Sequence, residues 1–86
     1  MASFDVRLRP SVHKDLQQVH AKAVPRILSA IRALADDPFP RGSARVVGDE
    51  HFHRIRVGVY RVIYSVDART REVTVQYVRH RSVAYR

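Results

Sequence analysis

The sequence has no cysteine and no tryptophan, and its 86 residues include only three glycines and four prolines. Without cysteine the chain can form neither a disulfide framework nor a zinc–thiolate site. Its apolar runs are a few residues long, well short of a membrane span, and no secretory signal opens the chain. These absences favour one small domain that spans residues 1–86 and folds on an ordinary hydrophobic core. The expected location is the cytoplasm.

Acidic residues are also scarce in this chain. Eight Asp and Glu stand against sixteen Lys and Arg, which gives a net charge of +8, and arginine supplies fourteen of the cations. The excess is concentrated in residues 51–86, where eight arginines face only Asp67 and Glu72. A basic half of this kind is typical of proteins that bind a polyanion, nucleic acid first. A solvated basic surface without a polyanionic partner would give the same count.

Hydrophobic periodicity predicts a strand and two helices in the first half of the chain. Residues 3–9 alternate between apolar and polar, which is typical of a half-buried strand, and Pro10 ends it. We expect Ser11 to cap a first helix, and Pro25 to break that helix or open a second one at its first turn. The two apolar stripes comprise Val12, Leu16, Val19 and Ala23, then Ile27, Leu28, Ile31, Leu34 and Ala35.

The second half of the chain alternates as strands do. The expected strands are residues 45–47, 52–57, 60–66 and 72–79, after a loop at 39–43 and before a short ending at 81–86. The predicted fold class is therefore α+β: an N-terminal strand, a helical hairpin, then an antiparallel β-meander with the helices packed on one sheet face. The other face of the sheet is expected to be open.

A Gly58-Val59 pair between two strand-like runs predicts a two-residue type II′ turn. In that register Arg56 lies opposite Arg61, and Arg54 shares their face. The residues expected on the other face, toward the helices, are Ile55, Val57, Tyr60, Val62 and Tyr64. Two arginines directly opposite each other are unfavourable by up to about 1 kcal/mol, whereas their planar forks suit phosphate. The alternative is that the arginines splay into solvent or pair with Asp49 and Glu50.

The C-terminus adds further residues that can bind a ligand or take part in a reaction. It contains Arg79-His80-Arg81 and Tyr85-Arg86, and a tyrosine beside arginines can stack on a base or simply pack the last turn. His80 can take part in proton transfer or can cap the last strand. His51 and His53 alone lack a third ligand nearby, so we expect neither a metal nor a cofactor.

Residues 54–64, 78–81 and 83–86 together resemble the RelE/ParE toxin superfamily of type II toxin–antitoxin pairs. The motifs that carry this resemblance are a Gly-x-Tyr-Arg-x-x-Tyr hairpin over residues 58–64 and the His-Arg…Tyr-Arg ending. The likeness extends over the whole chain and favours the RelE-like branch. Members resembling RelE are endoribonucleases that enter the ribosomal A site and cut the mRNA codon there. Members resembling ParE inhibit DNA gyrase and generally lack the full set of site residues.

The resemblance implies a set of catalytic positions: Arg54, Arg56, Arg61, Arg81 and Tyr85, joined by His80 as a candidate for proton transfer. RNA contacts would come from Arg54, Arg56, Arg61, Arg79, Arg81 and Arg86. Lysines often occupy the family's first two positions, and arginine is a poor general base, so the identity of the base stays open.

No carboxylate cluster suits a two-metal nuclease, so the expected reaction is metal-free attack of a 2′-hydroxyl on the adjacent phosphate. The implied partners are a cognate antitoxin, the ribosome and mRNA, with no membrane. The alternatives are a gyrase inhibitor without nuclease activity and an inactive RNA-binding homologue.

Overall fold

Five strands form one mixed sheet in the computed structural model, which describes residues 3–82. The elements in chain order are β1 (Asp5–Leu8), α1 (Pro10–Gln17), the 3₁₀ turn η1 (Ala21–Ala23), α2 (Val24–Ala33), β2 (Ala44–Val46), β3 (Asp49–Val57), β4 (Tyr60–Asp67) and β5 (Glu72–His80). This order confirms the predicted strand, helix pair and meander. The strands lie side by side in the order β1-β5-β4-β3-β2.

The first strand closes the sheet beside the last one. β1 pairs parallel to β5, with Asp5 opposite Glu72 and Leu8 opposite Val75, whereas the other pairings are antiparallel. A parallel neighbour needs a long crossover connection, and the helices and the first three meander strands supply it. The sheet is therefore mixed, with the predicted antiparallel meander extended by one parallel edge.

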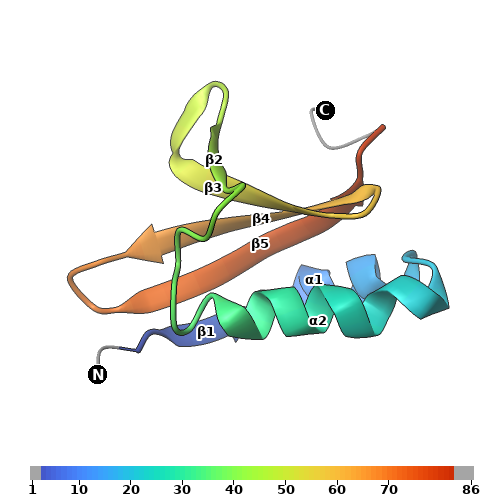
Figure 1. Cartoon of the computed structure of the whole chain (residues 1–86), viewed down its shortest axis with the longest axis horizontal. Helices are drawn as coiled ribbons and strands as arrows, with labels where there is room; N and C mark the ends of the chain where they lie inside the picture. Colours follow the sequence, from blue (N-terminus) through green and yellow to red (C-terminus); the bar gives the residue numbers. More distant parts are fainter. Residues whose placement is uncertain (1–2, 83–86) are drawn as a thin grey trace.

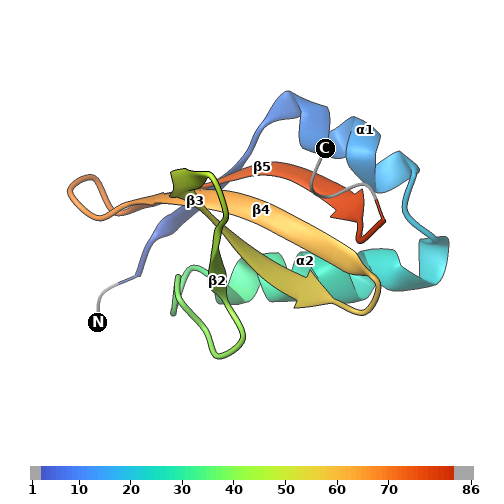
Figure 2. The same ribbon diagram turned by 90° about the horizontal axis from the view of Figure 1, so that it is seen from above.

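Both helices lie on the same face of the sheet, as the sequence predicts (Figure 1). Seen from above, α1 lies along β5 while α2 crosses beneath β3 and β4 (Figure 2). The opposite face carries no helix among the described residues. None of the helices within residues 3–82 is long and apolar enough to cross a membrane.

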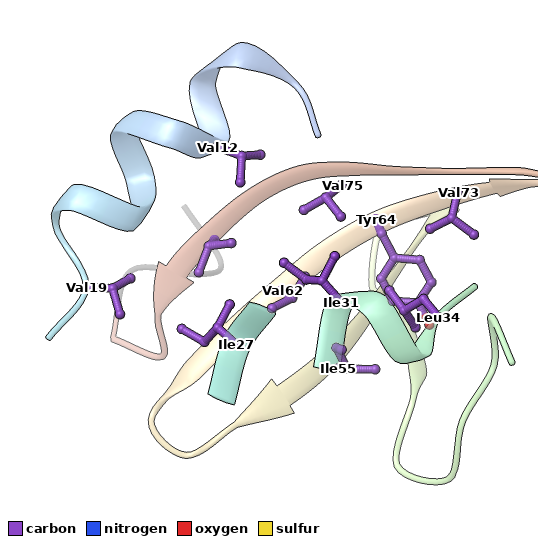
Figure 3. Close-up of a cluster of buried hydrophobic side chains, with 11 residues drawn as sticks. Val12, Val19, Ile27, Ile31, Leu34, Ile55, Val62, Tyr64, Val73 and Val75 are labelled. Carbon is purple, nitrogen blue, oxygen red and sulfur yellow. The ribbon is translucent and has the colours of Figure 1, made fainter. Parts of the chain in front are cut away.

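The core fills the space between the helices and the sheet (Figure 3). Its buried members are Val12, Val19, Ile27, Ile31, Leu34, Ile55, Val62, Tyr64, Val73, Val75 and Val78. Val57 and Tyr60 pack against them, so the predicted helix-facing set on β3 and β4 is confirmed. Tyr64 is fully buried, and its hydroxyl donates a hydrogen bond of 2.7 Å to the carbonyl of Pro38.

The first helix begins and ends differently from the prediction. Arg9 holds the extended N-cap position and Pro10 occupies the first turn, because proline's fixed φ suits a helix start. Ser11 therefore lies inside the helix, where its hydroxyl donates to the carbonyl of Gln76. The helix also ends at Gln17, so Val19 continues the buried stripe from outside it.

The turn between β3 and β4 forms at Gly58-Val59 as predicted. Val57 pairs with Tyr60, Arg56 with Arg61 and Arg54 with Ile63. Gly58 has a φ of +59° while Val59 keeps a negative φ, the pattern of a type II′ turn. This two-residue turn sets the register of the strands that carry the candidate site.

Candidate nucleic-acid interface

Three arginines form a row across three neighbouring strands on the open face. Arg56 of β3 pairs with Arg61 of β4, and Arg61 pairs with Arg79 of β5. Neighbouring strands lie about 5 Å apart, so the three side chains start within reach of one another. The residues that alternate with them, Val57, Val62 and Val78, belong to or pack against the core. The row therefore projects away from the helices.

A second row lies one pleat away on the same face. It consists of Arg54, Ile63 and Tyr77, which pair across the same three strands. Ile63 is only 2% exposed although it stands outside the helix-side core cluster, and long arginine stems can cover such an apolar residue. The guanidinium of Arg79 lies 4.8 Å from the centre of the Tyr77 ring, which is a cation–π contact.

The arginines differ in how they are held. Arg79 pairs with the carboxylate of Asp15 on α1, and the same carboxylate accepts the Val78 N–H at 2.9 Å. Arg61 is half-buried, and its Nη1 donates a hydrogen bond of 2.8 Å to the carbonyl of Arg81. These contacts fix the middle and the β5 end of the row.

Arg54 and Arg56 carry no carboxylate partner among the described residues. The ion pairs within residues 3–82 join Arg7 to Glu72 and Arg79 to Asp15. The alternative in which Asp49 and Glu50 neutralise the open-face arginines is therefore wrong; the Asp49 side chain instead accepts the His51 N–H. The positive charge at the β3 end of the row is available to an external anion.

Arg41 joins this end of the site, and the sequence prediction did not include it. It lies in the loop before β2 and lines, with Gly42, Arg54 and Arg56, a shallow hollow of about 270 Å³. Loops have no periodicity from which a face can be inferred, so no pattern placed Arg41. Tyr77 was also missed, although its two-residue spacing from Arg79 indicates the same face.

Arg81 lies at the same end of the sheet, just beyond β5. Its N–H donates to the carbonyl of Val59 at 2.7 Å, and its own carbonyl receives the hydrogen bond from Arg61. Its side chain is exposed. The turn and the end of β5 thus hold Arg81 beside the arginine row. Tyr85 and Arg86, the two remaining predicted site residues, lie outside the described residues.

His80 is not brought together with the arginines. It pairs with Tyr60, a residue of the core side, and their rings lie 5.6 Å apart in an edge-to-face contact. Its Nδ1 accepts the N–H of Ser82 at 3.2 Å, which is the strand-capping alternative. Neighbouring residues of a strand point to opposite faces. Because His80 is next to Arg79 and Arg81 in sequence, it lies on the face opposite to theirs.

The other two strand histidines do not form a metal site. The ring of His53 lies on the core side, 5.0 Å from Phe39 and 5.8 Å from Tyr64, and His51 is exposed. Burial, helped by the charge of Arg45, lowers the pKa of His53 below its usual 6.5. Within residues 3–82 no three His, Cys, Asp or Glu side chains group in a way that could hold a metal ion.

The arginine end of the open face therefore offers fixed cations, whereas Glu50, Asp67 and Glu72 line a separate hollow nearer the β4–β5 turn. Guanidinium groups can each donate two parallel hydrogen bonds to a phosphate, and a row of them can follow a chain of phosphates. Arg56, Arg54 and Arg41 supply exposed or half-exposed charge, while Arg61, between Arg56 and Arg79, is half-buried and held by the Arg81 carbonyl. This arrangement can bind and stabilise an anion, and its chemistry is electrostatic.

Similarity to known proteins gives independent evidence on the family of this chain. A family model described as the ParE toxin of type II toxin–antitoxin system, parDE, matches residues 6–85. No curated protein matches the chain significantly.

Solved structures of toxin–antitoxin proteins are similar to this chain. A chain of the archaeal RelE–RelB complex from Pyrococcus horikoshii OT3 is 28% identical, with a TM-score of 0.80 over 95% of this chain and 99% of that chain. A chain of the toxin–antitoxin complex RelBE2 from Mycobacterium tuberculosis is 26% identical, with a TM-score of 0.69 over 92% and 99%. The YoeB/ParE toxin from Agrobacterium tumefaciens has the same fold at 23% identity, with a TM-score of 0.72 over 90% and 98%. Because the family model spans nearly the whole chain, this protein belongs to the ParE toxin family of type II toxin–antitoxin systems, within the RelE/ParE superfamily.

Proposed function

We propose that this toxin is a ribosome-dependent endoribonuclease that cuts mRNA in the ribosomal A site and so inhibits translation. The observation that supports this proposal is the row of Arg56, Arg61 and Arg79 on the open sheet face, extended by Arg54 and Arg41. Such a row suits a chain of phosphates better than a single anion. The resemblance to the RelE-like branch supplies the reaction.

In the proposed reaction the 2′-hydroxyl of one nucleotide attacks the adjacent phosphorus. The new O2′–P bond forms as the P–O5′ bond breaks, which leaves a 2′,3′-cyclic phosphate and a 5′-hydroxyl. The proton lost by the 2′-oxygen is balanced by the proton gained by the 5′-oxygen. Arg56 and Arg61 hold the scissile phosphate, and Arg54 and Arg81 complete the clamp. Their fixed charges stabilise the extra negative charge of the phosphorane.

Proton transfer is the step for which the arginine row supplies no group. Arginine does not normally deprotonate, and His80 lies on the opposite face, so we leave His80 out of the reaction. We propose that the ribosome completes the site by shaping the mRNA for in-line attack. Tyr85 keeps its proposed role of stacking on a base at the cut, which rests on the sequence resemblance. Free RNA should then be cut poorly.

The test is a reconstituted bacterial translation reaction in which mRNA 5′ ends are mapped by primer extension. Wild-type toxin should produce discrete cuts only when ribosomes are present. Arg56→Ala should lower the cleavage rate by about 10²–10³, the usual effect of losing one preorganised donor to a developing anion. Arg69→Ala is the matched control, because Arg69 is exposed at the β4–β5 turn, at the other end of the sheet. Tyr85→Ala should lower the cleavage rate if the ring stacks on a base, whereas Tyr85→Phe, which keeps the ring, should not.

The match to the ParE toxin model favours a second candidate function, inhibition of DNA gyrase without nuclease activity. Intact mRNA and undisturbed translation at saturating toxin would contradict the nuclease proposal. Purified toxin that stabilises a gyrase cleavage complex would then establish the second candidate. Binding to RNA with neither effect would identify an inactive RNA-binding homologue.

We also propose a cognate antitoxin as the partner of this chain and the cytoplasm as its location. The similar structures from P. horikoshii and M. tuberculosis are toxin–antitoxin complexes. The uncovered sheet face and the exposed sides of the helices are the surfaces left for such a partner. An antitoxin with acidic side chains would complement the net charge of +8.

A further inference from the structure

A second basic surface lies on the helix side of the same end of the sheet. It is a hollow of about 520 Å³ beside the β3–β4 turn, and the polar side chains and turn residue that define it are His20, Lys22, Arg26, Gly58, Tyr60 and His80. None of its lining residues is acidic. The open-face arginines stand on the other side of the same turn, so this hollow is separate from the candidate site.

Two contacts fix the geometry of this hollow. The backbone N–H of His20 donates to the hydroxyl of Tyr60 at 2.9 Å, which ties the segment before α2 to β4. The guanidinium of Arg26 lies over the turn, since a Cβ placed on Gly58 would stand 3.9 Å from both of its terminal nitrogens. A residue other than glycine at position 58 would strain a φ of +59°, although its Cβ would make only ordinary van der Waals contact with Arg26.

The two histidines each present a hydrogen-bond donor to the hollow. The Nδ1 of His20 accepts the N–H of Lys22, and the Nδ1 of His80 accepts the N–H of Ser82. A neutral imidazole whose Nδ1 accepts carries its proton on Nε2. Both rings therefore offer an Nε2–H donor beside the charges of Lys22 and Arg26.

Lys22 and Arg26 have no carboxylate partner among the described residues. Both side chains are exposed, and the ion pairs within residues 3–82 involve other cations. Two cations and two histidines around a hollow with no acidic lining residue match a ligand that carries acceptors and negative charge. Phosphate diesters meet that description, and sugars and bases can cover the apolar floor that Val57 and Tyr60 provide.

We propose that this hollow binds phosphates of a second stretch of RNA backbone, apart from the stretch at the arginine row. The choice of RNA over an acidic protein segment rests on the proposed function, which brings RNA to this end of the molecule. The Gly58-Val59 turn then projects between two basic surfaces, one on each face of the sheet. The toxin holds RNA from both sides of this turn.

The test measures binding of a fluorescently labelled single-stranded RNA by anisotropy without ribosomes, across a series of salt concentrations. For single strands the logarithm of affinity falls by about 0.7 per contacted phosphate for each tenfold rise in salt. Lys22→Ala/Arg26→Ala should therefore make the salt slope shallower by about 1.4, and the advantage of wild type should shrink about sevenfold between roughly 50 and 200 mM salt. Lys22→Glu/Arg26→Glu should enlarge the loss.

The matched control is Arg32→Ala/Arg69→Ala, which removes the same charge from exposed positions elsewhere on the molecule. It should leave the slope close to that of wild type. Equal slopes for the two double variants would overturn the proposal, because the effect would then be general electrostatics. Loss of binding to an acidic antitoxin peptide with an unchanged RNA slope would overturn it in favour of a protein partner.

Nuclear magnetic resonance tests the proposal on the wild-type protein. Its outcome therefore depends neither on whether a variant folds nor on nuclease activity. Unlabelled RNA added to labelled wild-type toxin should shift the amide signals of Lys22, Arg26 and Gly58. Shifts confined to β3, β4 and β5 positions of the open face would contradict it. If the toxin cuts no mRNA but shows these shifts and the altered slope, the nuclease proposal is contradicted. The proposal of a second RNA-binding surface is then still supported.

Discussion

The two faces of the sheet are made by the same three strands and have opposite characters. On the helix side, Ile55, Val62 and Val78 pack into a core without charged groups. On the open side, the residues one position away are Arg54, Arg56, Arg61 and Arg79. Alternation along a strand therefore separates the residues that form the core from the arginines of the proposed site. Either set can be changed with little effect on the other.

Two residues blur this division. Ile63 is buried on the open side, where it lies between Arg54 and Tyr77. Asp15 belongs to a helix, yet its carboxylate pairs with Arg79 of the open face. The first places buried apolar surface on the open face, and the second pairs with one of the charges of that face. They show where the stability of the sheet and the electrostatics of the site are coupled.

The largest expected difference between the faces is in stability. Ile27→Ala removes a fully buried side chain from the helix-side core and should lower the free energy of unfolding by about 2–5 kcal/mol. Arg54→Ala/Arg56→Ala should change it by no more than about 0.5 kcal/mol, since neither arginine has a carboxylate partner within residues 3–82. Urea unfolding followed by circular dichroism measures both. A loss above about 2 kcal/mol in the arginine variant would show that the open face contributes to stability as the core face does.

The next effect concerns the hydroxyl of Tyr64, a polar group inside the core. Tyr64→Phe removes the hydroxyl that donates to the Pro38 carbonyl and should cost about 1–3 kcal/mol, because that acceptor stays buried without a partner. Burial raises the pKa of Tyr64 above its usual 10.0.

The folded state therefore keeps the Tyr64 proton at a pH where the unfolded chain loses it. This contribution to stability is complete below pH 10.0 and disappears as pH rises through the folded-state pKa. Alkaline unfolding curves of wild type and Tyr64→Phe should converge at high pH. Parallel curves throughout would show that Tyr64 plays no part in the alkaline loss.

Local patterns predicted the parts of the fold that depend on neighbours in sequence. The Gly58-Val59 turn set the pairing of β3 with β4, so the turn chemistry alone was enough to place Arg56 opposite Arg61. The same alternation rule, applied to β5, puts Arg79 and Tyr77 on the open face and His80 on the other. His80 is adjacent to these arginines in sequence, which on a strand means the opposite face, and its contact with Ser82 agrees with the capping alternative.

Contacts between distant segments were beyond such reasoning. Asp15 and Val78 are 63 positions apart, so no periodicity indicates that a helix carboxylate will tie down the last strand. The parallel pairing of β1 with β5 is equally non-local, because it depends on where the crossover returns. Arg41 sits in a loop without a repeating pattern. Sequence therefore placed the arginines within each strand, whereas their partners came from tertiary structure.

A smaller effect is expected from the ion pair between Asp15 of α1 and Arg79 of the open face. Asp15→Asn keeps an acceptor for the Val78 N–H and removes the charge that pairs with Arg79. Arg79 should then contact one more phosphate, which makes the salt dependence of RNA binding steeper by about 0.7. Asp36→Asn gives the same net charge at an exposed site and serves as the control. Equal salt slopes for the two variants would show that Asp15 does not restrain Arg79.

The smallest expected effect comes from His53, the one histidine packed on the core side against Tyr64 and Phe39. Burial, with Arg45 nearby, lowers the pKa of His53, so the unfolded chain binds a proton here more readily than the folded one. The contribution to stability is present above pH 6.5 and is lost as pH falls through the folded-state pKa. His53→Phe should therefore reduce the fall in melting temperature on acidification, whereas His13→Phe, at an exposed position, should not. A His53 ring signal that titrates at or above 6.5 would contradict this, because the ring would then gain no stability from staying neutral.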